Sequence, residues 1–249
     1  MTSEWTTVAW LPVMLVPLLL LKRWLNRHMQ GLGLLLTKDV QKAILLQYLA
    51  LLPGIMLHEV SHLVAARLVG VQTKGFSLRP KAVRGGNVRL GSVVVRHSDP
   101  IRESWIGLAP LLSGTAAILL LARWRLGIAP LPSLGLETLV KNLFIYLRAP
   151  DAWLWLYLIF AISNAMFPSE SDRQQWGPVL LFLALIVGLV YALGLVRQVS
   201  ADVRGYALTG VGYLTYAFGL TIGVDLLFAG AILLLEKLGE QLLQRRVEY

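Results

Sequence analysis

The stretch ALLPGIMLHEVSHLVAARLV, residues 50–69, decides how this chain folds. It lies in an apolar segment, residues 43–69, that exceeds the roughly 20 residues an α-helix needs to cross a bilayer. Three ionisable side chains interrupt the segment: His58, Glu59 and His62. An ionisable group inside a bilayer is costly unless it is paired or coordinated. The triplet therefore predicts a polar site within a membrane helix.

The composition of the whole chain is that of a membrane protein. Of its 249 residues, 56% are hydrophobic and only 15% are charged, whereas a soluble domain carries about 25% charged residues. The apolar residues come in long blocks, which argues against a soluble enzyme and a disordered regulator. The chain has no cysteine, which argues against a disulfide scaffold and leaves no thiolate for a zinc site.

The net charge of +9 raises the question of an acidic partner. In a soluble protein such a charge would suggest nucleic acid. Here the Lys and Arg residues mostly flank the apolar blocks, where the headgroups of a lipid bilayer are the natural partner. We therefore expect the bilayer and no nucleic acid.

Six apolar blocks predict about six transmembrane helices, so the expected fold class is an all-α polytopic membrane protein. They cover residues 8–21 with short extensions, 43–69, 105–122, 152–167, 178–196 and 211–235. The first block follows an acidic rather than a basic flank and shows no small-residue cleavage site, so we expect an uncleaved anchor. The expected location is a multi-pass position in the cell membrane.

Two segments between the blocks have other patterns. Residues 73–98 are polar, basic and rich in β-branched residues on both sides of a glycine pair, which predicts a small β-hairpin or sheet. Residues 134–148 carry apolar positions at helical spacing, which predicts an amphipathic helix at the membrane interface.

The blocks suggest three sections along the chain. Residues 1–42 form an N-terminal anchor and linker, and residues 43–176 form a metal-binding membrane core that contains the hairpin and the amphipathic helix. Residues 177–249 add two C-terminal helices.

The triplet has the form H-E-x-x-H, which carries a specific chemistry. On a helix, His58 and His62 lie one turn apart on the same face, so their imidazoles can share one Zn²⁺ ion. Glu59 lies beside them and is expected to act as the general base rather than as a ligand.

A catalytic zinc needs a third protein ligand. No further histidine lies at a short spacing, so a carboxylate is expected. The sequence leaves several open: Asp99, Glu103, Glu170, Asp172 and Asp225. Asp225 is isolated within the last apolar block, where an interhelical hydrogen bond is the expected role.

A second motif narrows the choice. Asn164 and Asp172 are eight residues apart, with Pro168 between them. Together with H-E-x-x-H in a membrane helix and the β element after it, this pattern resembles the site-2 protease family of intramembrane zinc metalloproteases. The resemblance implies that Asp172 is the third ligand, with Glu170 as its nearest competitor, and that Asn164 contacts substrate or the oxyanion. Arg173 stands where the family has glycine, so the motif is divergent.

The function that this resemblance implies is zinc-dependent hydrolysis of a peptide bond in a membrane-anchored protein. An edge of the hairpin would then suit an extended substrate that pairs as an added strand. Two other functions remain open: a non-catalytic subunit of a membrane complex that retains a protease-like core, and a zinc hydrolase that acts on a lipid or another small amphiphile.

Overall fold

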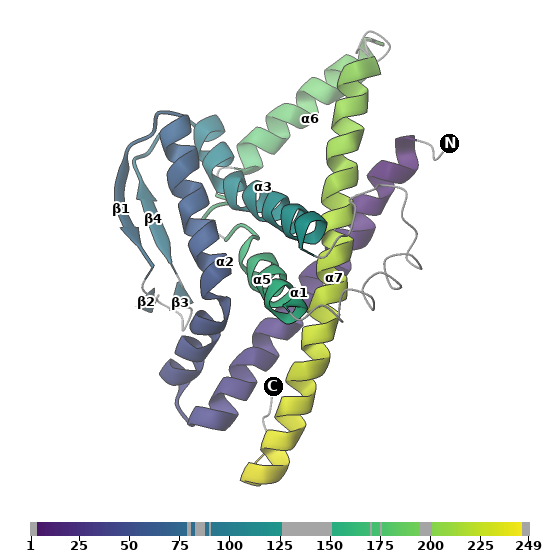
Figure 1. Ribbon diagram of the computed structural model, residues 1–249. Helices are drawn as coiled ribbons and strands as arrows, with labels where there is room; N and C mark the ends of the chain where they lie inside the picture. The colour runs from purple at the N-terminus through teal and green to yellow at the C-terminus, as the bar shows by residue number, and fades with distance from the viewer. Residues whose placement is uncertain are drawn as a thin grey trace.

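The computed structural model is mostly helical, with one small β region beside the second helix (Figure 1). It describes residues 4–78, 81–82, 88–89, 91–125, 151–169, 171–174, 176–194 and 201–245. The helices are α1 (Glu4–Thr37), α2 (Val40–Leu68), α3 (Pro100–Trp124), α5 (Ala152–Ala165), α6 (Trp176–Ala192) and α7 (Ala201–Leu243). The strands are β1 (Thr73–Ser77), β2 (Lys81–Ala82), β3 (Val88–Arg89) and β4 (Ser92–Val95).

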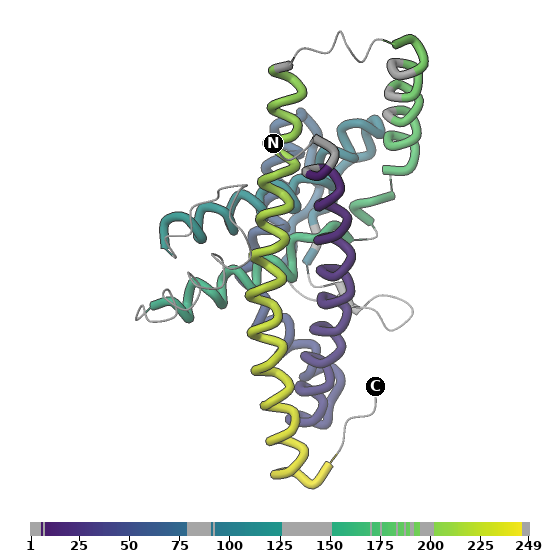
Figure 2. The backbone as a smooth tube through the Cα atoms, turned by 90° about the vertical axis from the view of Figure 1, so that its right-hand side faces the viewer, coloured from purple at the N-terminus to yellow at the C-terminus, as the bar shows by residue number. Residues whose placement is uncertain are grey.

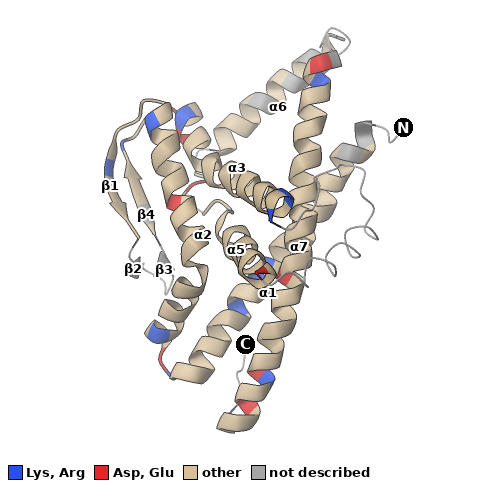
Figure 3. Ribbon diagram, in the orientation of Figure 1, with Lys and Arg blue, Asp and Glu red and all other residues tan. Residues whose placement is uncertain are grey.

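Four of the described helices, α1, α2, α3 and α7, are long and apolar enough to cross a membrane. The expected number of about six is not confirmed, because α5 has 14 residues and α6 has 17. At 1.5 Å per residue α5 is about 21 Å long, well below the roughly 30 Å of a hydrocarbon core. Charged residues are sparse along all of these helices (Figure 3).

The first and last helices pack along each other over much of their length (Figure 2). Two polar contacts fix α1 in place. The Nδ1 atom of His28 lies 2.8 Å from Oε2 of Glu236 on α7, and Asn26 accepts a hydrogen bond of 3.1 Å from Gln47 on α2. Helix α1 also continues to Thr37, well past the end of the predicted apolar block, so Lys22 lies near its middle.

Small residues allow α2, α3 and α5 to cross closely. A Cβ atom on Gly54 of α2 would overlap the main-chain carbonyl of Ala161 on α5. One on Gly114 of α3 would lie 2.5 Å from Cβ of Met166. Such close approach favours helix association in a membrane, where burial of apolar surface gives little advantage.

The predicted β element is present as an antiparallel pair of β1 and β4, with a shorter pair of β2 and β3 beyond it. It does not extend away from the end of α2 but runs back beside that helix, with β4 between β1 and α2 (Figure 1). The hydroxyl of Tyr48, in the first half of α2, donates to the carbonyl of Leu78. Residues 83–87 at the hairpin turn and the predicted amphipathic helix at 134–148 lie outside the described residues.

Helix α5 ends shortly before a proline. Pro168 has no N–H to continue a helical ladder, and the chain leaves the helix after Ala165. The loop that follows carries Ser169 and Asp172 back toward α2. Helix α5 therefore stops two residues before the end of the predicted fourth block, and the chain after it lines the cavity.

Candidate metal centre

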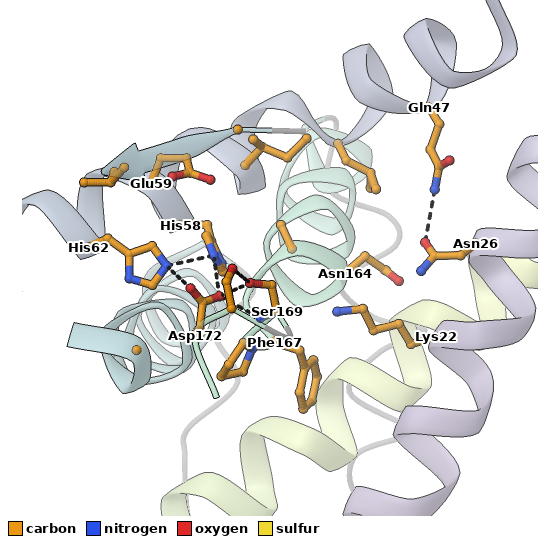
Figure 4. A pocket seen from close by; sticks show the side chains of 18 of the residues that line it. Lys22, Asn26, Gln47, His58, Glu59, His62, Asn164, Phe167, Ser169 and Asp172 are labelled. Atoms are coloured by element: carbon orange, nitrogen blue, oxygen red, sulfur yellow. Dashed lines mark hydrogen bonds and ion pairs between the residues drawn. The ribbon is translucent and has the colours of Figure 1, made fainter. Parts of the chain in front are cut away.

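The two histidines of the H-E-x-x-H motif lie on one face of α2 and point into a cavity (Figure 4). Their Nε2 atoms are 3.1 Å apart, and the rings meet edge to face. His62 is 6% exposed. The helical spacing thus brings both imidazoles to one point, as the sequence predicted.

Asp172 reaches the same point from the loop after α5. Its Oδ1 atom is 3.3 Å from Nε2 of His62, and its Oδ2 atom is 3.6 Å from Nε2 of His58. One ligand atom from each of the three residues lies within 4.8 Å of the other two. The structure therefore gathers the three residues that the two motifs single out.

The ring of His62 is oriented by a main-chain carbonyl. Its Nδ1 atom lies 2.9 Å from the carbonyl oxygen of Ile106 on α3. A carbonyl only accepts, so Nδ1 carries the proton, and in a neutral ring Nε2 presents a lone pair. Nδ1 of His58 is buried and has no hydrogen-bond partner among the described residues.

The carboxylate of Asp172 is also held by its surroundings. Its Oδ2 atom accepts hydrogen bonds of 2.7 Å and 2.6 Å from the main-chain N–H and the hydroxyl of Ser169. Its main-chain carbonyl lies so close to α3 that a Cβ atom on Gly107 would overlap it. Burial would raise the pKa of Asp172, but His58 and His62, when protonated at Nε2, and the hydrogen bond from Ser169 lower it below its ordinary value.

The three side chains lie close enough together to share one ion. Zinc binds imidazole nitrogen and carboxylate oxygen at about 2.0–2.2 Å, which places neighbouring ligand atoms roughly 3.3–3.6 Å apart. The two Nε2 atoms are 3.1 Å apart, and the nearest carboxylate oxygen is Oδ1 for His62, at 3.3 Å, and Oδ2 for His58, at 3.6 Å. The set is nitrogen, nitrogen and oxygen, and three such ligands would leave one position of a zinc ion open, as in a catalytic site.

Glu59 lies in the same cavity, on the β4 side of the two histidines (Figure 4). It is 6% exposed. Its carboxylate is packed against Gly91, where an added Cβ atom would come within 2.6 Å of Oε1. The residue before β4 thus has to be small for Glu59 to occupy this position.

Asn164 also lines the cavity, but its amide is already engaged on one side. Its Nδ2 atom donates at 3.0 Å to the carbonyl of Phe160 and at 3.0 Å to Oδ1 of Asp225 on α7. Because the Phe160 carbonyl only accepts, the amide nitrogen must face it. The two amide hydrogens are thereby used, and Asn164 offers an acceptor oxygen rather than the donor that an oxyanion needs.

The other carboxylates that the sequence left open have different roles in the described residues. Asp99 caps the N-terminus of α3 through the N–H of Arg102. Glu103 accepts a hydrogen bond from the N–H of Ser98. Asp225 makes the interhelical hydrogen bonds that the sequence predicted for it. Glu170 lies outside the described residues.

The cavity has a volume of about 740 Å³ and extends well beyond the histidines. Polar residues of α1 form the wall of the cavity opposite the histidines: Lys22, Asn26 and Gln30. Hydropathy alone would place these residues at the flank of an apolar block. Their spacing of four residues puts them on one face of a helix, and that periodicity is the signal in the sequence that could have found them.

No family model matches the chain, and neither does any curated protein or solved structure. The likeness to the site-2 protease family thus rests on two short motifs, at residues 58–62 and 164–172. In the structure both motifs line the same cavity.

Proposed function

We propose that this chain is an intramembrane zinc metalloprotease that crosses the membrane several times. The observation that carries the proposal is the approach of Nε2 of His62 to Oδ1 of Asp172 at 3.3 Å. In its neutral form, with its proton on Nδ1, His62 presents a lone pair to a carboxylate, and two acceptors at this distance repel each other unless a cation or a proton lies between them. Nε2 of His58 lies 3.6 Å from the other carboxylate oxygen, Oδ2, so a metal ion held by all three residues accounts best for the arrangement.

His58, His62 and Asp172 would hold the ion. When bound, Zn²⁺ supplies Lewis acidity that makes water nucleophilic near neutral pH and polarises a carbonyl group. Glu59 has the role of general base, since it lies in the same cavity and is not one of the three clustered ligands. It takes a proton from the attacking water and delivers it to the departing amine.

The shape of the site favours a polypeptide in extended form. A helical segment hides its peptide groups in internal hydrogen bonds and must unwind before hydrolysis. Gly91, Val93 and Val95 line the cavity along β4, so a main-chain edge runs beside the metal ligands. A strand-like substrate segment that pairs with this edge would have its peptide bonds presented to the site.

Comparison of protein N-termini in membranes from cells that produce the wild type or Glu59→Gln tests the proposal even while the substrate is unidentified. We expect N-termini that arise within or beside apolar segments in the wild type, and their loss by at least about a hundredfold in the variant. Zinc content should be equal in the two proteins.

Two outcomes would favour the other functions. Equal sets of N-termini, with zinc present in both proteins, would support hydrolysis of a lipid or another amphiphile. Equal sets with no zinc in either protein would support a non-catalytic subunit of a membrane complex.

A further inference from the structure

Lys22 is a cation in the middle of a long apolar helix. It follows Glu4, the first residue of α1, by 18 positions and precedes Thr37, the last, by 15. At 1.5 Å per residue these separations are about 27 and 22 Å, too far for its side chain to reach either end of the helix. Charged residues of membrane helices that face an internal cavity typically line a substrate or ion path, and Lys22 lines the cavity of the candidate site.

The ammonium group of Lys22 has no hydrogen bond or ion pair in the part of the chain that the structure describes. It lies 4.8 Å from the centre of the Phe167 ring, a cation–π contact. Asp225 is near enough to act on its charge, but Oδ1 of Asp225 accepts from Ser163 and Asn164, and no hydrogen bond joins Asp225 to Lys22 among the described residues. Among the residues that the structure describes, the donor capacity of Lys22 is therefore unused.

Lys22 is also the only Lys or Arg among the described residues that line the cavity. Figure 4 shows it beside Asn164, across the cavity from His62. Since the amide hydrogens of Asn164 are committed to Phe160 and Asp225, that residue cannot donate to a bound molecule. On this wall of the cavity the charged donor is Lys22.

We propose that Lys22 is a substrate-binding residue that donates a hydrogen bond to a main-chain carbonyl oxygen of the polypeptide in the cavity. An unwound chain exposes carbonyl groups that have lost their helical partners, and each needs a donor in a low-dielectric environment. A positioned ammonium group meets that need more strongly than a neutral donor. This inference rests on the proposed metalloprotease function and adds a specificity element on α1.

Two hydroxamates test this role in the zinc-loaded protein. Acetohydroxamate has a metal-binding group and no peptide bond, whereas a hydroxamate of a neutral tripeptide with an amidated C-terminus also carries main-chain carbonyls. Dissociation constants for both compounds would be measured with the wild type, Lys22→Met, Lys22→Arg and Arg23→Met. Arg23 is the matched control, because it is exposed on the same helix and does not line the cavity.

We expect Lys22→Met to weaken the tripeptide hydroxamate about tenfold or more and to leave acetohydroxamate unchanged. Lys22→Arg should recover part of the loss, and Arg23→Met should behave as the wild type does. Equal weakening of both compounds in Lys22→Met would show a structural role and overturn the inference, and so would no change in either. A wild type that binds zinc but neither hydroxamate would also overturn it. A wild type that binds no zinc would refute the proposed function itself and the inference with it.

Discussion

Nε2 of His62 and Oδ1 of Asp172 lie 3.3 Å apart, although one residue is on α2 and the other follows α5. Nδ1 of His62 donates to the carbonyl of Ile106, and Oδ2 of Asp172 accepts from the N–H of Ser169, so each group is fixed through its other polar atom. Such outer contacts fix the orientation of metal ligands before the metal arrives. An ion at the proposed site would therefore meet two groups that are already oriented, and substitution of either group tests the proposal.

Replacement of Asp172 by Asn should abolish the stabilisation of the protein by zinc. The wild type should gain roughly 2.7 kcal/mol of stability when free zinc is a hundred times its dissociation constant. An amide is a poor zinc ligand, so Asp172→Asn should show almost no rise in Tm when zinc is added. Thermal unfolding in detergent, with and without zinc, measures the difference. Asp99→Asn is the control, since Asp99 caps α3 away from the three ligands; an equal zinc effect in wild type and Asp172→Asn would contradict the assignment.

Replacement of Gly91 by Ala should lower activity while it preserves zinc binding. The new Cβ atom would lie 2.6 Å from Oε1 of Glu59 and would push that flexible carboxylate aside. A shift of about 1 Å in a catalytic group can reduce the rate roughly a hundredfold. Gly75→Ala is the matched control in the same sheet, because its nearest neighbour would be 4.0 Å away. Appearance of new membrane-protein N-termini measures the effect, and equal activity of the two variants would argue against the role of Glu59.

The hydrogen bonds between α5 and α7 at Asp225 should contribute to stability. Asp225→Ala removes the acceptor of two interhelical hydrogen bonds, from Ser163 and Asn164, and should cost about 1 kcal/mol. Thr221→Val is the control, since the Thr221 hydroxyl is buried and has no partner among the described residues. It should be neutral or slightly stabilising. A smaller loss of unfolding free energy for Asp225→Ala than for Thr221→Val would mean that these two hydrogen bonds do not stabilise the protein.

Single cysteines can test whether α2 crosses the membrane, because the chain has none of its own. Lys42 and Gln72 are exposed near the two ends of this 29-residue helix, which is about 43 Å long. Lys42→Cys and Gln72→Cys should react with a membrane-impermeant thiol reagent from opposite sides of the membrane. Reaction of both from the same side would show that α2 does not cross.

Much of the site was predictable from local sequence, but the cavity wall that α1 forms was not. The spacing of His58 and His62 fixes their shared helix face, and the β-branched residues after α2 predict the hairpin, so both features were found. Hydropathy alone suggested that Lys22 flanks a span, because a window average does not show which way one side chain points. In the structure Lys22 faces the cavity, since α1 continues past it as a helix that packs on α7.

The contacts of the last turn of α5 could not be predicted from the sequence. Residues 152–167 are apolar enough to resemble a span, yet the helix ends at Ala165. Its last turn carries Asn164, which α7 holds through Asp225, a contact between residues far apart in the chain. Tertiary hydrogen bonds of this kind leave no periodic signal.

Zinc stoichiometry of the purified wild type, Asp172→Ala and Glu59→Gln tests the central claim most directly. We expect about one zinc ion per chain in the wild type and in Glu59→Gln, and loss of that zinc in Asp172→Ala, because one of three protein ligands is removed. A wild type without zinc, or zinc that remains in Asp172→Ala and is lost in Glu59→Gln, would contradict the metal centre proposed for this chain.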